Sequence, residues 1–121
     1  MQFNYEQLDV AKLAKKLILF IYKTTQNKFP TEERFALSSQ LRRASVSVIL
    51  NIAEGNSRAT KKDYGNFIKI AIGSTVEVDC ALKIAIELSY IDQSTYLEIE
   101  PTIKELYFKL IGLSNYLEES Q

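Results

Sequence analysis

Apolar residues recur at intervals of three and four positions along four stretches of this chain, and short breaks separate the stretches. That spacing places them on one side of an α-helix. The 121 residues include only four glycines and two prolines, too few for the many turns of an all-β fold. The sequence therefore predicts an all-α protein with long helices over residues 5–27, 32–55, 60–89 and 94–117.

The short connections predict how these helices pack. Sequential helices joined by a few residues are antiparallel neighbours, which is the up-down-up-down topology of a four-helix bundle. A chain of this length has room for one hydrophobic core. We therefore expect a single bundle domain over residues 1–121.

Proline, glycine and capping residues mark the breaks. Pro30 is expected to end the first helix and start the second, and Gly55 to close the second helix in a left-handed conformation. Thr60 is expected to cap the third. Pro101 allows two interpretations, one kinked helix that continues through it or a separate turn over residues 94–100. The kinked helix is the favoured interpretation.

The stretch 32–55 is apolar on more than one side. One stripe consists of Leu37, Leu41, Val48 and Ile52. A second apolar arc consists of Val46, Leu50 and Ala53. The polar seam between them consists of Arg43, Ser47, Asn51, Glu54 and Arg58. A helix that is apolar around most of its circumference is buried around most of it. Three neighbours in so small a bundle cannot enclose this helix, so the second arc predicts contact with another subunit.

The net charge is zero, but the charges are unevenly distributed. Residues 1–75 carry 12 basic and 6 acidic side chains, and residues 76–121 carry 3 basic and 9 acidic ones. The two parts can neutralise each other within the fold, or the first can form a basic face for an anionic partner. A possible nucleic-acid contact, with Tyr64 nearby, is Arg58, Lys61, Lys62 and Lys69. Ordinary solvated lysines at a helix end give the same pattern.

Several classes of function lack the residues they need. The chain has no histidine, which removes Ser-His and Cys-His nucleophilic pairs and histidine metal ligands. No glycine-rich phosphate loop is present, and we expect neither an enzyme, nor a metal, nor a cofactor. Cys80 is the only cysteine and cannot form a disulfide within the chain. With no signal segment and no membrane span in the sequence, the cytoplasm is the expected location.

Glu77 is the remaining polar residue of interest, because the periodicity embeds it in a second apolar side of the third helix. A buried charge is tolerated when it is paired, so we predict that Glu77 accepts hydrogen bonds from Arg43 or Arg42. Asn51, Glu54 and Arg58 would then satisfy one another or a neighbouring subunit. The alternatives are a network that only fixes helix register, a small-anion or metal pocket, and an interaction surface. A hydrolase that uses Glu54 and Glu77 as its carboxylates is a further, weaker hypothesis.

Three runs of sequence are distinctive: residues 29–35 (FPTEERF), 39–44 (SQLRRA) and 51–55 (NIAEG) followed by Arg58. Together with Phe67, Ala71, the pair Gly73-Ser74 and Glu77, they closely resemble the four-helix bundle proteins of the 23S rRNA intervening-sequence family. The resemblance covers roughly residues 8–117. The accessory variability protein of diversity-generating retroelements is similar in fold, and it looks like a partner of nucleic acid and reverse transcriptase with a strongly basic surface. The resemblance to it implies an alternative function, an RNA- or DNA-binding accessory protein that acts with a nucleic-acid enzyme.

The resemblance implies a bundle that associates with copies of itself, as a ring of five subunits, and it does not imply an enzyme. We therefore expect a non-enzymatic interaction module. It also implies that packing and assembly use the motif positions Arg42, Arg43, Asn51, Glu54, Gly55, Arg58 and Glu77. The neutral charge here departs from the basic retroelement relative. Ser89 stands where members commonly have glycine before tyrosine, and Pro101 is atypical.

Overall fold

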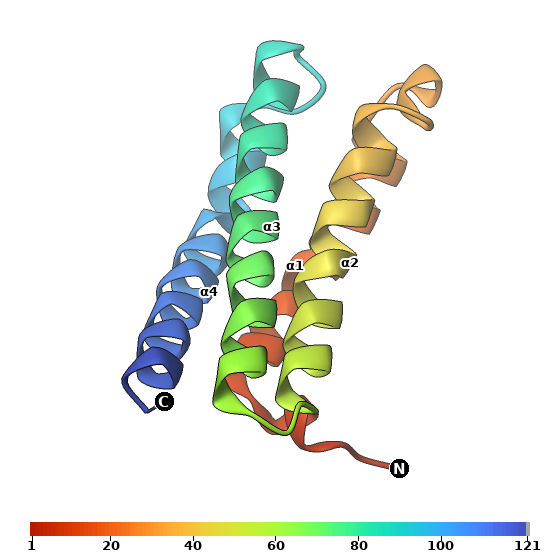
Figure 1. The fold of residues 1–121 in the computed structure, drawn as a ribbon. Coiled ribbons are helices and arrows are strands. Elements are labelled where there is room, and N and C mark those ends of the chain that lie inside the picture. The colour runs from red at the N-terminus through yellow and green to blue at the C-terminus, as the bar shows by residue number, and fades with distance from the viewer. Residues whose placement is uncertain (121) are drawn as a thin grey trace.

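The computed structural model describes residues 1–120, and within them the chain is entirely helical and free of strands. A 3₁₀ turn at Asn4–Gln7 precedes the first long helix, and a second one at Thr31–Glu33 precedes the second. The four long helices are α1 Asp9–Lys28, α2 Leu37–Asn56, α3 Lys61–Glu87 and α4 Gln93–Glu119. They form the predicted antiparallel four-helix bundle (Figure 1). Each helix packs beside its two neighbours, α2 and α3 most extensively, and within residues 1–120 the backbones of the diagonal pairs do not approach each other closely.

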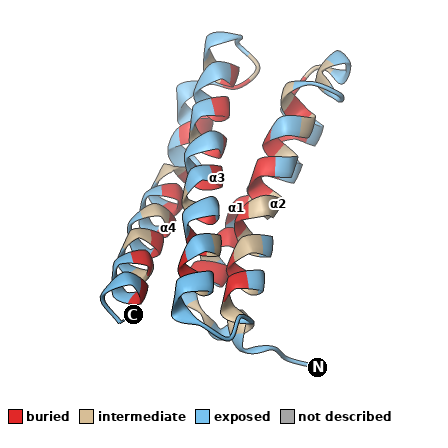
Figure 2. Cartoon of the chain, in the orientation of Figure 1, coloured by how far each residue is buried: buried red, intermediate tan, exposed pale blue. Residues whose placement is uncertain are grey.

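The core lies along the centre of the bundle, where each helix turns its apolar stripe inward (Figure 2). Its largest fully buried side chains include Leu17 and Ile21 of α1, Ile52 of α2, Leu82 of α3 and Leu106 of α4. Because these residues follow the three- and four-residue spacing, the stripes read from the sequence coincide with the core.

The first two helices begin later than the sequence predicts. Residues 4–7 form a 3₁₀ turn, so α1 begins at Asp9 instead of residue 5. After Pro30, residues 31–33 form another such turn, and α2 begins only at Leu37. The Glu33 side chain accepts a hydrogen bond of 3.0 Å from the Leu37 backbone N–H. It thereby satisfies one of the free amides that every helix start leaves without an intrahelical partner.

The later helix starts are capped by side chains. As predicted, the Thr60 hydroxyl accepts a 3.1 Å hydrogen bond from the Asp63 backbone N–H. At the start of α4, Asp92 accepts hydrogen bonds from both the backbone N–H (2.9 Å) and the hydroxyl (2.8 Å) of Thr95. These hydrogen bonds and one from the Ser94 hydroxyl lower the pKa of Asp92 to about 2.

The prediction that Gly55 ends α2 in a left-handed conformation is wrong. Gly55 is helical and buried, α2 continues to Asn56, and no glycine among residues 1–120 has a positive φ. Gly55 serves close approach instead, because a Cβ built on it would lie 2.9 Å from the Phe67 Cβ and 3.0 Å from the Tyr64 ring. A glycine near a helix end can either terminate the helix or allow a neighbouring helix to approach closely. Gly55 has the second role.

The left-handed residue is Ser89, with a φ of 63° just after α3. The Ser89 N–H bonds to the Ile86 carbonyl and the Tyr90 N–H to the Ala85 carbonyl, both at 2.9 Å. This is the Schellman arrangement that closes many helices, and its left-handed position normally holds glycine. At Pro101, α4 continues as one helix through residues 93–119, so the alternative of a separate turn over residues 94–100 is wrong.

Candidate interaction face

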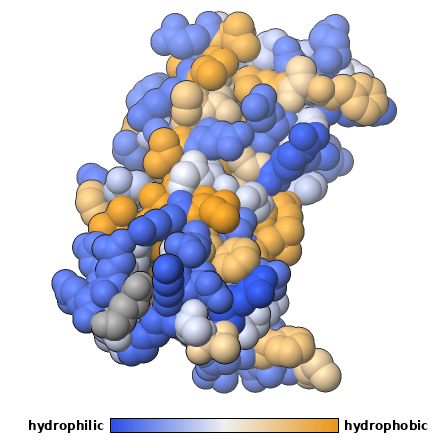
Figure 3. Space-filling model, viewed as in Figure 1, coloured by the Kyte–Doolittle hydropathy of each residue, from blue (hydrophilic) through white to orange (hydrophobic). Residues whose placement is uncertain are grey.

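The outer side of α2 and α3 carries apolar side chains that the bundle does not cover. Leu50 is 61% exposed, Ile70 51% and Ile84 45%. Val46 is half-buried beside them on α2. We call this the α2–α3 face, defined by Arg43, Val46, Leu50, Ile70, Glu77 and Ile84. Figure 3 views the molecule with α2 and α3 toward the reader and shows separate apolar patches among polar atoms.

The predicted second arc of α2 therefore does point outward, although its members differ in exposure. Leu50 is open to solvent, whereas Val46 and Ala53 are each half-buried by the chain itself. The second apolar side of α3 shows the same division, since Ile70 and Ile84 are exposed and Ala81 is buried. Helical geometry explains the exposure of Leu50, because a position about 180° from the core direction cannot reach a neighbouring helix of the same bundle.

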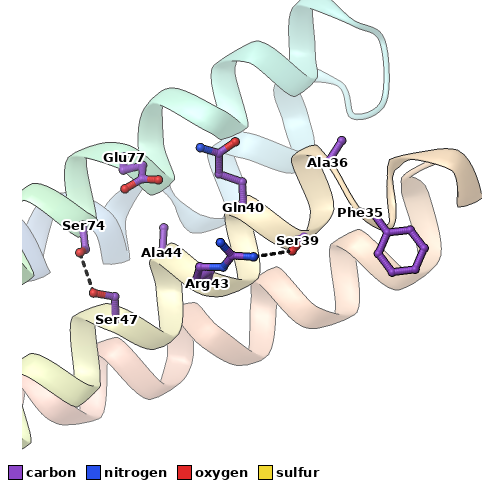
Figure 4. A pocket seen from close by; sticks show the side chains of 9 residues that line it. All are labelled: Phe35, Ala36, Ser39, Gln40, Arg43, Ala44, Ser47, Ser74 and Glu77. Carbon is purple, nitrogen blue, oxygen red and sulfur yellow. Dashed lines mark hydrogen bonds between the residues drawn. The ribbon is translucent and has the colours of Figure 1, made fainter.

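A hollow of about 440 Å³ lies at one end of this face, between α2 and α3. Figure 4 shows Gln40 and Ala44 pointing from α2 toward α3, and Glu77 projecting from α3. On its floor the hydroxyl oxygens of Ser47 and Ser74 lie 2.9 Å apart, which fixes the register of the two helices. A second hollow at the other end is lined by Leu50, Phe67 and the N-terminal Phe3 among others.

The predicted hydrogen bond from an arginine to Glu77 is not formed in the single chain. Glu77 is exposed and lies in no ion pair described for residues 1–120. Arg43 lines the same hollow but donates to the Ser39 hydroxyl at 3.3 Å. Arg42 lies on the side of α2 that faces α1, where its Nε donates to the Thr25 hydroxyl at 2.8 Å. Periodicity placed Glu77 on an apolar side of α3, as found, but the prediction that this side buries Glu77 within the chain is wrong.

The rest of the polar seam forms hydrogen bonds and an ion pair within α2 and the residues just after it. The Asn51 side-chain amide donates to the backbone carbonyl (2.8 Å) and the hydroxyl (3.1 Å) of Ser47, one turn earlier. Glu54 and Arg58 form an ion pair of 3.0 Å across one turn. Every buried side-chain nitrogen or oxygen in the described part of the chain has a hydrogen-bond partner, so no buried polar group there requires a ligand.

The two carboxylates of the hydrolase hypothesis lie far apart. The Ser47–Ser74 contact sets the antiparallel register, which places Glu54 level with Phe67. Glu77 lies ten residues further along α3, or about 15 Å at 1.5 Å per residue. Paired catalytic carboxylates of glycoside hydrolases lie within about 10 Å of each other, and Glu54 is already paired with Arg58. Over residues 1–120, no group of three or more acidic or cysteine side chains is placed to hold a metal ion.

Comparison with known proteins identifies the family. Residues 6–112 match the family described as 23S rRNA-intervening sequence protein. The chain belongs to this family. A solved structure similar to this chain is a protein of unknown function from the S23 ribosomal protein family of Bacteroides thetaiotaomicron. It superposes with a TM-score of 0.76 at 25% identity, covering 87% of this chain and 97% of its own. No curated protein matches.

Most residues of the possible nucleic-acid contact, Arg58, Lys61, Lys62 and Lys69, contact other side chains of the same chain. Lys69 pairs with Glu118 of α4 at 2.8 Å, and Arg58 pairs with Glu54 and lies 4.7 Å from the Phe67 ring. The Lys61 ammonium lies 5.4 Å from the Tyr116 ring centre. Three of the four members therefore have partners in the fold.

Two tyrosine contacts were not anticipated from the sequence. Tyr96 of α4 is buried and donates to Asp79 of α3 at 2.6 Å, and burial followed by this bond raises the pKa of Tyr96 to about 12. Tyr90 donates to Glu33 at 2.7 Å, which lowers the pKa of Glu33. Both contacts join residues distant in sequence, and no local pattern specifies such pairs. Within residues 1–120, no helix has the length and apolar character needed to span a membrane.

Proposed function

We propose that this family member is a non-enzymatic interaction module that associates with copies of itself through the α2–α3 face. The form we propose is the ring of five subunits that the family resemblance implies. The observation that supports the proposal is the alignment of Leu50, Ile70 and Ile84, each about half exposed or more, on one outer surface. Exposed apolar groups rimmed by polar residues are typical of interaction sites.

The energetics indicate that apolar contact alone is not enough. Covering the remaining exposed part of one such side chain is worth about 1 kcal/mol, since complete burial of a leucine or isoleucine is worth about 1.5–3 kcal/mol. Association costs at least about 4 kcal/mol in translational and rotational freedom. Three side chains per copy therefore need complementary polar contacts to give a stable assembly.

Arg43 and Glu77 can supply those polar contacts between copies. They carry opposite charges, both line the hollow on the α2–α3 face, and neither is in an ion pair within the described chain. We propose that Arg43 of one subunit pairs with Glu77 of the next. Such a pair would fix orientation and exclude wrong partners. The pair would also explain why Glu77 lies between the apolar residues Ile70 and Ile84. If another subunit covers this face, the Glu77 carboxylate is buried and must be paired with an opposite charge.

The absence of histidine from the sequence and the separation of Glu54 from Glu77 support a role other than catalysis. The lone cysteine, which offers no disulfide framework, supports a cytoplasmic location. A nucleic-acid-binding accessory role remains our alternative. The basic set Arg58, Lys61, Lys62 and Lys69 offers it little support, because three of its members have internal partners.

A matched pair of substitutions tests the proposal. Leu50→Lys places a charge on the α2–α3 face, and Leu97→Lys makes the same change on α4, where Leu97 is 50% exposed. We expect sedimentation velocity to show dissociation of the Leu50→Lys protein and an unchanged assembly for Leu97→Lys. Dissociation of both variants, or of neither, would contradict the assignment of the contact to this face. Unchanged circular dichroism spectra would show that both variants remain folded.

A further inference from the structure

The outer side of α1 carries lysines that the fold leaves without partners. Lys12, Lys15, Lys16 and Lys23 are all exposed, and none is in an ion pair described for residues 1–120. We call these four residues the α1 lysine face. The only acidic residue of α1 is Asp9 at its start, and Lys109 of α4 holds it at 3.2 Å. Lys109 also pairs with Glu105, one turn earlier in α4, at 3.1 Å.

Helical spacing arranges these lysines along the helix. Lys12, Lys16 and Lys23 follow one another at intervals of four and seven residues, which keeps them on one side of α1. The eleven residues from Lys12 to Lys23 correspond to about 16 Å. Lys15 lies beside this row, in line with Leu19 and Tyr22.

An aromatic side chain held in a fixed position lies next to the lysines. Tyr22 is 40% exposed, and the Arg42 guanidinium of α2 lies 4.6 Å from its ring centre. Arg42 is itself fixed, because it donates to the Thr25 hydroxyl at 2.8 Å and to the Tyr22 carbonyl at 3.5 Å. The lysine row therefore ends beside an arginine–tyrosine stack.

We infer that the α1 lysine face binds the phosphate backbone of single-stranded nucleic acid, with Tyr22 contributing a stacking surface for a base. A row of unpaired lysines attracts successive phosphates and releases their counterions. A neighbouring aromatic group is the second component of sites for single strands. The site differs from the set Arg58, Lys61, Lys62 and Lys69, and it does not depend on the self-association proposed above.

The packing of α1 argues against a membrane surface as the occupant. A helix that lies in a membrane interface inserts an apolar face into the lipid. The apolar stripe of α1, including Ala14, Leu17 and Ile21, is completely buried in the bundle core. Only Leu19, at 72% exposure, projects fully from among the lysines, which is too little apolar surface for insertion.

The test compares two double variants of equal charge in the full chain. Lys12→Gln with Lys16→Gln removes two members of the α1 lysine face. Arg34→Gln with Lys104→Gln removes two exposed basic residues elsewhere that lie in no described ion pair. Binding of a fluorescein-labelled 20-nucleotide RNA is followed by anisotropy from 20 to 200 mM salt. We expect the plot of log K against log salt to lose about 1–2 units of slope in the first variant and almost none in the second.

Tyr22→Leu separates stacking from charge. We expect weaker RNA binding with an unchanged salt slope, since no phosphate contact is lost. Equal loss in both double variants, or no RNA binding by the wild type at 20 mM salt, would overturn the inference. Binding to phosphatidylserine–phosphatidylcholine vesicles without RNA binding would overturn it in favour of a membrane surface. Sedimentation of the same variants distinguishes this outcome from a failure of self-association.

Discussion

Gly55 of α2 and Phe67 of α3 lie so close that a methyl group on Gly55 would be 2.9 Å from the Phe67 Cβ. The contact joins the two helices whose outer sides form the α2–α3 face, at the end opposite the hollow near Glu77. A carbon–carbon distance that short lies inside the van der Waals minimum of about 3.5–4.0 Å. The pairing of α2 with α3 therefore depends on the missing side chain.

Gly55→Ala should destabilise the protein. Alanine normally favours a helix by about 0.5–1 kcal/mol over glycine, but overpacking typically costs about 1–3 kcal/mol, so we expect a net loss. Gly112→Ala in α4 is the control, because a Cβ there meets no atom within 4 Å, and it should stabilise. Urea unfolding of the two variants checks the opposite signs. A stabilised Gly55→Ala protein would show that the helices are not held at this distance.

Ser89→Gly should stabilise the protein by about 1 kcal/mol. Ser89 has a φ of 63°, and left-handed backbone costs a residue with a Cβ about 1–2 kcal/mol relative to its preferred conformation. The gain is reduced because glycine loses more entropy on folding. Ser89→Ala is the control and should leave the melting temperature nearly unchanged. A melting temperature that does not rise in Ser89→Gly would argue against the left-handed closure of α3.

Pro101→Ala should stabilise α4, by up to about 3 kcal/mol. Pro101 lies inside Gln93–Glu119 and cannot donate the hydrogen bond that a helical residue makes to the carbonyl four positions earlier. Pro30 provides the comparison, since it stands outside the helices with a φ of −60° that suits proline. Pro30→Ala should give no such gain. Thermal unfolding of the two variants distinguishes the positions, and equal shifts would contradict this account.

Asp92 should contribute to the acid sensitivity of the fold. Hydrogen bonds from Thr95, first from its hydroxyl and then from its backbone N–H, lower the Asp92 pKa from 3.8 to about 2. A carboxylate with a pKa lowered in the folded state stabilises that state above the unfolded pKa and loses this contribution as the pH falls. The loss should therefore occur between about pH 4 and pH 2.

Asp92→Asn keeps a helix-capping side chain but cannot titrate. The urea midpoint of this variant should fall less than that of the wild type between pH 5 and pH 2.5. Parallel curves for the two proteins would show that Asp92 is not the group responsible.

The sequence allowed the topology to be predicted because the core positions repeat with the helical period. Leu17, Ile52, Leu82 and Leu106 all follow that spacing, and all are buried. The cap at Thr60 was also predictable, since capping involves residues only three apart. These features are local, so a single sequence contains what is needed to infer them.

The errors arose where the outcome depends on another helix. Glycine is a common helix terminator, but Gly55 instead allows the close approach of Phe67 from α3. Arg42 and Arg43 are adjacent in sequence, yet one faces α1 and the other faces solvent. Periodicity placed Glu77 on the correct side of α3 without showing that this side is uncovered in a single chain.

Self-association through the α2–α3 face is the central claim, and the mass of the wild-type protein in solution tests it most directly. The chain has a mass of 13.8 kDa. Light scattering at micromolar concentration should give a multiple of this value, and five times it if the ring is correct. A mass of 13.8 kDa at every concentration, with Leu50 and Ile84 left open to water, would contradict the account.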